Sequence, residues 1–373
     1  MKINKSIIAC MVLGLGLLIS SCTVQKKASP YQEKMDAALH SLLSVRNDST
    51  GIWPDAGWWN SANVFTATIR YAEITNQKEK FLPIIEDIYK KTKKFPVYDE
   101  KGAFKFECVN YVNDYYDDEG WWALAWIEAY KLTQKKEYLE MSEKIFADMT
   151  TGWSDANGGG IFWKKNPWVY KNSIANNLFA LTAIRLYNHT QNSQYAEWFE
   201  KEVNWYLSTG MYNTTNNMIE DGLDSKTGQP NRERYYTYNQ GVAIAVLTEM
   251  YLYKQDKKYL TLAENLVQGI FQNLVTENGI LRERNTDIAA GNDGVQFKGI
   301  FMRHLAFLYR ITKNKAYRDF ILKNADSNIA NNYDTTSKSF GCYWYGPFNT
   351  VKTAANSSAL ECVLEAEAIL QED

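Results

Sequence analysis

The chain has 373 residues, 45% of them hydrophobic, so it can bury a large core as one big domain or two ordinary ones. The formal net charge of -2 gives no electrostatic reason to expect a nucleic-acid partner, which normally shows as a basic face. Aromatic residues reach 14%, with 12 Trp and 25 Tyr. Because the C–H faces of sugar rings stack on such side chains, this surplus favours a carbohydrate ligand.

Residues 1–21 have the pattern of a secretory signal peptide. Lys2 and Lys5 precede an apolar run over 7–19 that is too short to span a membrane as a mature helix. Small residues then lead directly into Cys22, which resembles a bacterial lipobox, so we expect Cys22 to be lipidated and 22–30 to be a linker. An ordinary signal cleaved nearby without a lipid is the alternative. The lipid would anchor the protein in the envelope of a Gram-negative bacterium, and the basic stretch after Cys22 favours the periplasmic face over the cell surface.

The rest of the chain repeats a helix pair about every 55 to 65 residues, longer than standard solenoid repeats. Each unit has an apolar helix end, a short polar turn and the start of a second helix, and similar stretches recur at 70–81, 128–139, 186–191, 251–259 and 308–317.

The first helix of each pair is apolar on nearly every face, as in 121–130, 174–187, 242–253 and 300–309. The second has a single apolar stripe, as in 138–149, 196–207, 259–274 and 317–329. All-apolar helices are buried and amphipathic ones cover them. With 32–45 and 356–370 the count is six of each, which predicts an all-α fold, an (α/α)6 barrel forming one catalytic domain over 31–373. An open superhelix is the alternative.

The connections between these helices are asymmetric. Turns from an inner to an outer helix are short, whereas connections from an outer to the next inner helix are long and rich in Gly, Trp, Tyr, Asn and Asp. They cover 51–60, the run to Asp118, 158–172, 238–241, 293–299 and 340–346. Long loops gathered at one rim are the usual place for function.

One of these loops leads into the motif 115–126, in which Asp117, Asp118 and Glu119 stand among two Tyr and three Trp. Carboxylates in an apolar wall acquire divergent pKa values, as acetal hydrolysis requires, because one group must be ionised and the other must donate a proton. Capping of a helix N-terminus is the alternative, although one Asp is enough for a cap. Asp293 competes for the role of second carboxylate, but turn chemistry explains its Asn-Asp-Gly setting equally well.

Other rim residues are candidates for sugar binding. The rings that could stack on sugars are those of Trp58, Trp59, Trp163 and Trp344. The hydrogen-bond donors at the starts of inner helices are Lys171, Asn172, Asn239, Gln240 and Lys298. The predicted site also includes Asn60, Tyr116, Trp121 and Tyr238. For each donor, helix capping or loop hydrogen bonding is an equal alternative. The run 158–160 of three Gly lacks the context of a phosphate loop and predicts a turn that lets the backbone approach a ligand closely.

Cysteine and histidine give no sign of a metal centre. After loss of Cys10 and lipidation of Cys22, the remaining Cys108, Cys342 and Cys362 allow one disulfide or three free thiols. The three His are widely separated, so we expect no metal site.

The motif residues taken together resemble glycoside hydrolase family 76. The resemblance lies in 116–126, 159–163, 171–176, 238–241 and 297–301 and extends from about Trp53 to the C-terminus. It implies an endo-acting α-1,6-mannanase on an (α/α)6 barrel that cleaves an α-mannan with retention and without a cofactor; we expect a monomer. By the same resemblance Asp117 matches the nucleophile and Asp118 the acid/base. Tyr115, Tyr116 and Phe162 replace residues that are often Trp in the family, which puts fine specificity in doubt.

A retaining mechanism needs carboxyl groups about 5 to 5.5 Å apart. A continuous helix through Asp117 and Asp118 would splay them by about 100°, so we predict that the helix starts at or after Asp118. Two functional alternatives remain. An unsaturated-uronyl hydrolase on the same barrel would need basic groups for a substrate carboxylate, and few Arg lie on the rim. A non-catalytic glycan-binding lipoprotein would not need the Asp pair.

Overall fold

The computed structural model describes residues 29–98, 104–166, 169–232, 234–283 and 291–372. The predicted signal peptide, Cys22 and most of the linker lie outside the described residues. In the described part, no helix is both long and apolar enough to cross a membrane.

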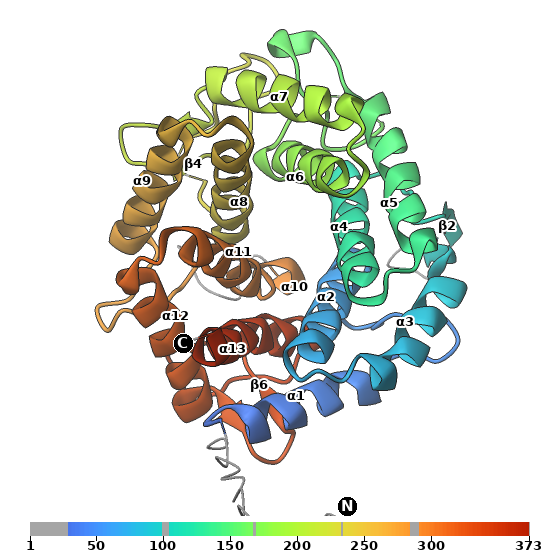
Figure 1. Ribbon diagram of the computed structural model, residues 1–373, viewed down its shortest axis with the longest axis vertical. Coiled ribbons are helices and arrows are strands. Elements are labelled where there is room, and N and C mark those ends of the chain that lie inside the picture. Colours follow the sequence, from blue (N-terminus) through green and yellow to red (C-terminus); the bar gives the residue numbers. More distant parts are fainter. Residues whose placement is uncertain (1–28, 99–103, 167–168, 233, 284–290, 373) are drawn as a thin grey trace, which may run out of the picture.

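Within the described residues, six helices form an inner ring and six form an outer layer, which confirms the predicted (α/α)6 barrel. The inner helices are α2 (Trp58–Ile74), α4 (Tyr116–Thr133), α6 (Ser173–Thr190), α8 (Thr237–Lys254), α11 (Phe297–Thr312) and α13 (Thr353–Glu372). The outer helices are α1 (Gln32–Ser44), α3 (Lys78–Thr92), α5 (Lys136–Met149), α7 (Ser193–Ser208), α9 (Lys257–Asn273) and α12 (Lys315–Asn331). Each inner helix packs against the next, and α13 packs back against α2. The ring is therefore closed, and Figure 1 shows it surrounded by the outer helices.

The short turns from inner to outer helices follow from helix-capping chemistry. Helices α4, α6, α8 and α11 each end at a residue in the left-handed conformation, with φ between 53° and 62°. The outer helices that follow three of these turns begin with a side-chain cap, from Asn192, Asp256 and Asn314. A left-handed residue followed by an N-cap satisfies the free backbone groups of both helix ends within two or three residues.

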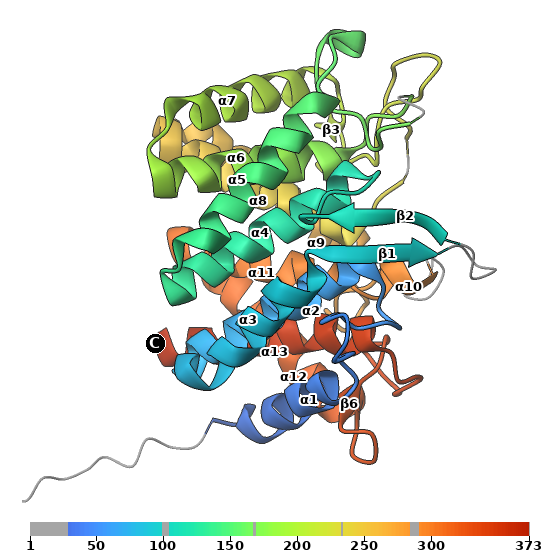
Figure 2. The same cartoon turned by 90° about the vertical axis from the view of Figure 1, so that its right-hand side faces the viewer.

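The long connections contain short elements that the all-α prediction did not include. These are the antiparallel pairs β1 (Lys94–Tyr98) with β2 (Phe104–Val109), β3 (Tyr212–Asn213) with β4 (Met218–Ile219) and β5 (Tyr333–Asp334) with β6 (Ser339–Phe340), two 3-10 turns (Thr150–Gly152, Ala156–Gly158) and the four-residue helix α10 (Gly291–Gly294). Figure 2 shows β1, β2, β6 and α10 at the same end of the barrel, opposite the C-terminus.

Polar side chains in the first turns of the inner helices hold these long connections. Asn176 of α6 bonds both the backbone N–H (2.8 Å) and the C=O (3.0 Å) of Ile161, and Gln240 of α8 bonds both groups of Ile219. Asn356 of α13 accepts a bond from the backbone N–H of Phe340. Buried backbone groups must find partners, and loops that lack a ladder find them in these side chains.

The sequence allowed either one disulfide or three free thiols among Cys108, Cys342 and Cys362. In the structure all three are buried free thiols.

Candidate active site

Asp117 and Asp118 lie in the first turn of α4, at the end of the barrel that carries the long connections. The prediction that the helix starts at or after Asp118 was wrong, because α4 begins at Tyr116. The backbone N–H of Glu119 already donates to Tyr115 O at 3.2 Å, which closes the first helical turn. The two carboxylates therefore leave the helix in different directions, and each has its own partner.

Asp117 points along the inner face of α4, one turn ahead of Trp121. The indole Nε1 of Trp163 donates to Asp117 Oδ2 at 2.9 Å, and the backbone N–H of Asp118 donates to Asp117 Oδ1 at 3.2 Å. Burial raises the pKa of Asp117 to about 7, and these two donors limit the rise.

Asp118 turns instead toward Asn113 in the connection that precedes α4. The Asn113 side-chain amide donates to Asp118 Oδ2 at 2.6 Å. Burial, together with the nearby charge of Asp117, raises the pKa of Asp118 well above its usual range. The two neighbours therefore have different environments, and the proton is held most firmly on Asp118.

Asp293, on α10, is a third acid beside this pair. Its Oδ1 accepts a 2.8 Å bond from Trp59 Nε1, and burial raises its pKa. Its charge raises the pKa values of both Asp117 and Asp118. The structure thus brings together three carboxylates, two in sequence and one from a helix more than 170 positions away.

Aromatic rings form the wall around these acids. Trp59 lies 5.8 Å from Trp121 and 6.1 Å from Phe297, measured between ring centroids, and Phe297 stacks on Tyr238 at 3.8 Å. Burial and the charges of three acids, including Asp117, raise the pKa of the Tyr238 hydroxyl. Rings grouped beside carboxylates suit a ligand with both apolar faces and hydroxyl groups.

A fourth acid, Asp221, was not predicted from the sequence. Its Oδ2 accepts a 2.8 Å bond from the Tyr170 hydroxyl and its Oδ1 a 3.2 Å bond from Asn239 Nδ2. Burial raises the pKa of Asp221, and its charge acts on Tyr238. The signal available in the sequence was an acid pair, Glu220 and Asp221, within a long connection.

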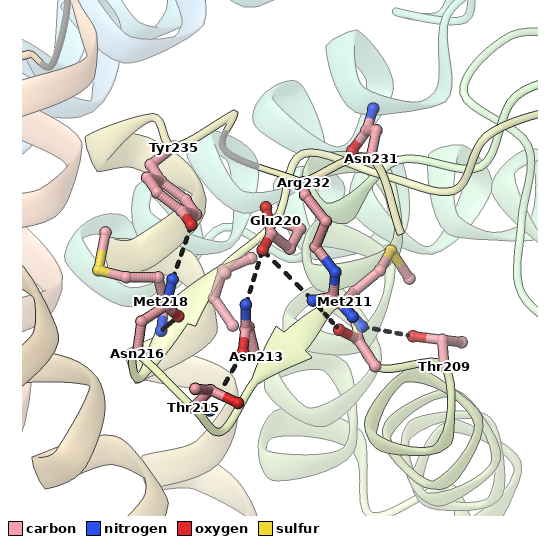
Figure 3. Close-up of polar contacts among 12 residues, drawn as sticks. Thr209, Met211, Asn213, Thr215, Asn216, Met218, Glu220, Asn231, Arg232 and Tyr235 are labelled. Atoms are coloured by element: carbon pink, nitrogen blue, oxygen red, sulfur yellow. Dashed lines mark hydrogen bonds and ion pairs between the residues drawn. The ribbon is translucent and has the colours of Figure 1, made fainter. Parts of the chain in front are cut away.

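The preceding residue, Glu220, anchors this segment. It is fully buried, and its Oε1 accepts from Asn213 Nδ2 at 2.9 Å and pairs with Arg232 at 3.4 Å (Figure 3). The hairpin of β3 and β4 is thereby fixed, and Asp221 follows directly.

Several predicted binding residues are instead part of the scaffold. Lys171 is buried, and its ammonium donates to the carbonyls of Ser154, Ala156 and Gly159. Burial lowers its pKa to about 8. Lys298 is buried and donates to Cys342 O at 2.7 Å beside the ring of Trp344, which is also fully buried.

The other predicted binding residues that belong to the scaffold are hydrogen-bonded, packed against other rings, or buried. Asn172 caps α6, accepting from Ala175 N at 3.2 Å, and Gln240 holds Ile219. The Tyr116 ring is buried, with its hydroxyl 3.0 Å from Thr151 Oγ1. Trp58 packs on Phe95 and Trp122, and Asn60 is buried in the first turn of α2.

The Gly-rich turn approaches a protein ring rather than an open cleft. Gly160 has φ +83°, and a Cβ on it would lie 2.2 Å from the Trp205 ring. Only Gly fits there. The close approach expected at 158–160 exists, but its partner is Trp205.

Comparison with known proteins agrees with this arrangement. The sequence model of glycosyl hydrolase family 76 matches residues 25–373. The chain belongs to this family. Among solved members of family 76 is an inactive variant of the α-1,6-mannanase GH76A of Salegentibacter in complex with α-1,6-mannotetrose, with two consecutive Asp replaced by Ala. It is 24% identical, has a TM-score of 0.79 and covers 92% of this chain and 100% of its own.

Two further relatives are similar to this chain, one in structure and one in sequence. A Listeria innocua protein is 28% identical with a TM-score of 0.78, over 92% of this chain and 99% of its own. The mannan endo-1,6-alpha-mannosidase of Candida albicans is 26% identical over 51% of this chain and 46% of its own. The chain spans about half the length of this curated relative.

Proposed function

We propose that this family 76 protein is a retaining, endo-acting α-1,6-mannanase. The observation that carries the proposal is the different environment of two consecutive carboxylates, with Asp117 bonded by Trp163 and Asp118 bonded by Asn113. The names of the Salegentibacter and Candida relatives supply the substrate class.

The proposed reaction is a double displacement. Asp117, the acid with the lower pKa of the two, attacks the anomeric carbon while protonated Asp118 donates its proton to the departing glycosidic oxygen. Asp118 then takes a proton from water, which attacks the same carbon and releases Asp117. Rings of Trp59, Trp121 and Tyr238 would pack on the sugars, and Asp221, Asn239 and Asp293 would receive hydroxyl groups.

The test is incubation of the purified protein with linear α-1,6-mannan and sizing of the products. An endo-acting enzyme gives a range of oligosaccharides from the start, and proton NMR of the first products shows the α-anomer if configuration is retained. Asp117→Asn and Asp118→Asn should each lose about 10³-fold or more in kcat, whereas Asp114→Asn, an exposed acid beside the motif, should keep activity.

Azide distinguishes the two roles. With a substrate that carries an activated leaving group, azide should rescue Asp118→Ala and give an α-glycosyl azide, because the covalent intermediate still forms. With Asp117→Ala, azide should attack directly and give the β-azide. Binding of mannan by the wild-type protein with no cleavage would identify a non-catalytic glycan-binding lipoprotein instead.

We further propose that Cys22 carries a lipid and anchors the enzyme in the cell envelope, on the periplasmic face, as a monomer. The support is the short apolar run that ends in small residues before Cys22. Cys22→Ser should release the protein from the membrane fraction, and light scattering of the released protein should give the mass of one chain.

A further inference from the structure

A cavity extends between the inner helices from Trp121, one turn after Asp117 in α4, to the ends of α2, α11 and α13. Its volume is about 430 Å³, within the range of small-molecule sites. It is lined by residues of five inner helices, α2, α4, α6, α11 and α13. Trp121 belongs to its wall and also packs on Trp59, whose indole bonds Asp293, so these two rings lie between the cavity lining and the acids. We refer to this cavity as the rear chamber.

Four arginines line the rear chamber, and two of them, Arg185 and Arg303, pair with glutamates that do not belong to its lining. Side chains of Arg70, Arg185, Arg303 and Arg310 are 19 to 26% exposed. Arg185 pairs with Glu249 and Arg303 with Glu361, and these two glutamates are only 6% and 4% exposed. Arg70 and Arg310 pair instead with Glu73, Glu365 and Glu372, which themselves line the chamber. The guanidinium groups of Arg185 and Arg303 therefore line the space, while their carboxylate partners are behind them.

A buried imidazole adds to this surface. His304 lines the chamber, is 7% exposed, and its Nε2 has no hydrogen-bond partner among the described residues. Burial and the positive charges of Arg303 and Arg185 lower its pKa. A buried polar nitrogen without a partner in a polar cavity indicates a place for a ligand atom.

The chemistry of the wall selects the ligand. Guanidinium groups only donate hydrogen bonds, so their best partners are pure acceptors such as carboxylate and phosphate oxygens. Carboxylates also line the chamber, with Glu128 paired with Lys131 and with Glu73 and Glu372 in the last turns of α2 and α13, which disfavours a large polyanion.

We propose that the rear chamber binds a small ligand through a carboxylate or phosphate group held by Arg185, Arg303 and His304. The chamber shares the ring of Trp121 with the proposed mannanase site, but the binding proposed for it does not depend on mannanase activity.

The probes are inorganic phosphate, acetate and mannose, each titrated into the full chain by isothermal calorimetry at constant ionic strength set with sodium chloride. Saturable binding of phosphate, acetate or both at one site per chain is the expected result, and the stronger of the two identifies the group. The double variant Arg185→Gln with Glu249→Gln removes a guanidinium together with its partner's charge. It should weaken binding by at least about tenfold.

The matched control is Arg46→Gln with Asp87→Asn, a charge-balanced change of an ion pair on the outer layer. It should leave binding within about twofold of the wild type. If the first double variant does not fold, Arg303→Lys keeps the positive charge beside Glu361 and loses the planar fork, and it should weaken binding by about fivefold or more. The proposal is overturned if neither anion saturates, if mannose alone binds, or if every chamber variant binds as tightly as the wild type.

Discussion

The indole Nε1 of Trp163 lies 2.9 Å from Oδ2 of Asp117 and donates a hydrogen bond to it. This bond joins the connection before α6 to the first turn of α4. It stabilises the ionised form of Asp117, while the neighbouring Asp118 has an amide as its partner and the charge of Asp117 beside it. The order of the two pKa values thus depends on a residue 46 positions from the pair.

Trp163→Phe should shift the acidic limb of the kcat/KM profile to higher pH. Phe cannot donate the bond that lowers the pKa of Asp117, so that pKa rises above about 7. One bond to a charged group is worth about 1.5 to 3 kcal/mol, or about one to two pH units. Trp153→Phe removes an indole that donates to Asp155 instead and serves as the control. If the acidic limb of Trp163→Phe stays at the pH of the wild type, the Trp163 bond does not control the ionisation of Asp117.

Asp293→Asn should shift both limbs of the profile to lower pH. The charge of Asp293 raises the pKa values of Asp117 and Asp118, and an amide removes that charge while still accepting from Trp59. The kcat at the new optimum should stay within about tenfold of the wild type. A loss as large as that of Asp118→Asn would instead make Asp293 one of the catalytic carboxylates.

Trp59→Ala should raise KM for α-1,6-mannotetraose by about tenfold, as expected for an aromatic contact of about 1 to 1.5 kcal/mol. Trp344→Phe is the control, because Trp344 is fully buried beside Lys298. Equal effects of both changes on KM would mean that Trp59 acts only through packing.

Lys171→Met should lower the free energy of unfolding by about 2 to 4 kcal/mol, because three carbonyls, of which that of Gly159 is buried, lose their shared donor. Measured by chemical denaturation, this loss should come with a KM within about twofold of the wild type. The opposite result, normal stability with a raised KM, would restore the sequence-based hypothesis that Lys171 binds sugar.

Glu361→Gln should stabilise the protein at pH 8 more than at pH 4.5. Burial raises the pKa of Glu361 from 4.5 to about 7, although Arg303 opposes the rise. The folded state therefore keeps the proton longer, and stability falls as pH increases from 4.5 to 7. A difference of about 2.5 units at about 1.4 kcal/mol each gives a gain of up to about 3.5 kcal/mol.

Glu365→Gln is the matched control, and its effect on stability should change with pH in the opposite direction. Burial acts to raise the pKa of Glu365, but Arg70 and Arg310 outweigh it and lower the pKa overall. The ionised form is favoured in the folded state, so removing it should destabilise the protein above pH 4.5. Thermal melts of both variants between pH 4.5 and 8 measure the two trends; parallel trends would contradict the assignment.

The barrel itself could be predicted because its causes are local. All-apolar helices such as 242–253 must be buried, amphipathic ones such as 259–274 must cover them, and short polar turns force neighbours to be antiparallel. The pair Asp117 and Asp118 stood out for the same reason, since acids surrounded by Trp and Tyr are unusual in any fold.

Only the tertiary structure decided which polar side chains lie beside the candidate active site. Lys171, Gln240 and Lys298 occupy the same kind of position as Asn239, yet the first three bond loop backbone and Asn239 bonds Asp221 of that site. The direction that a first-turn side chain takes depends on which loop packs over it, and buried backbone groups take the nearest donor. Loop packing is a long-range property, so neither the place of Asp221 nor the arginines of the rear chamber could be derived from local sequence.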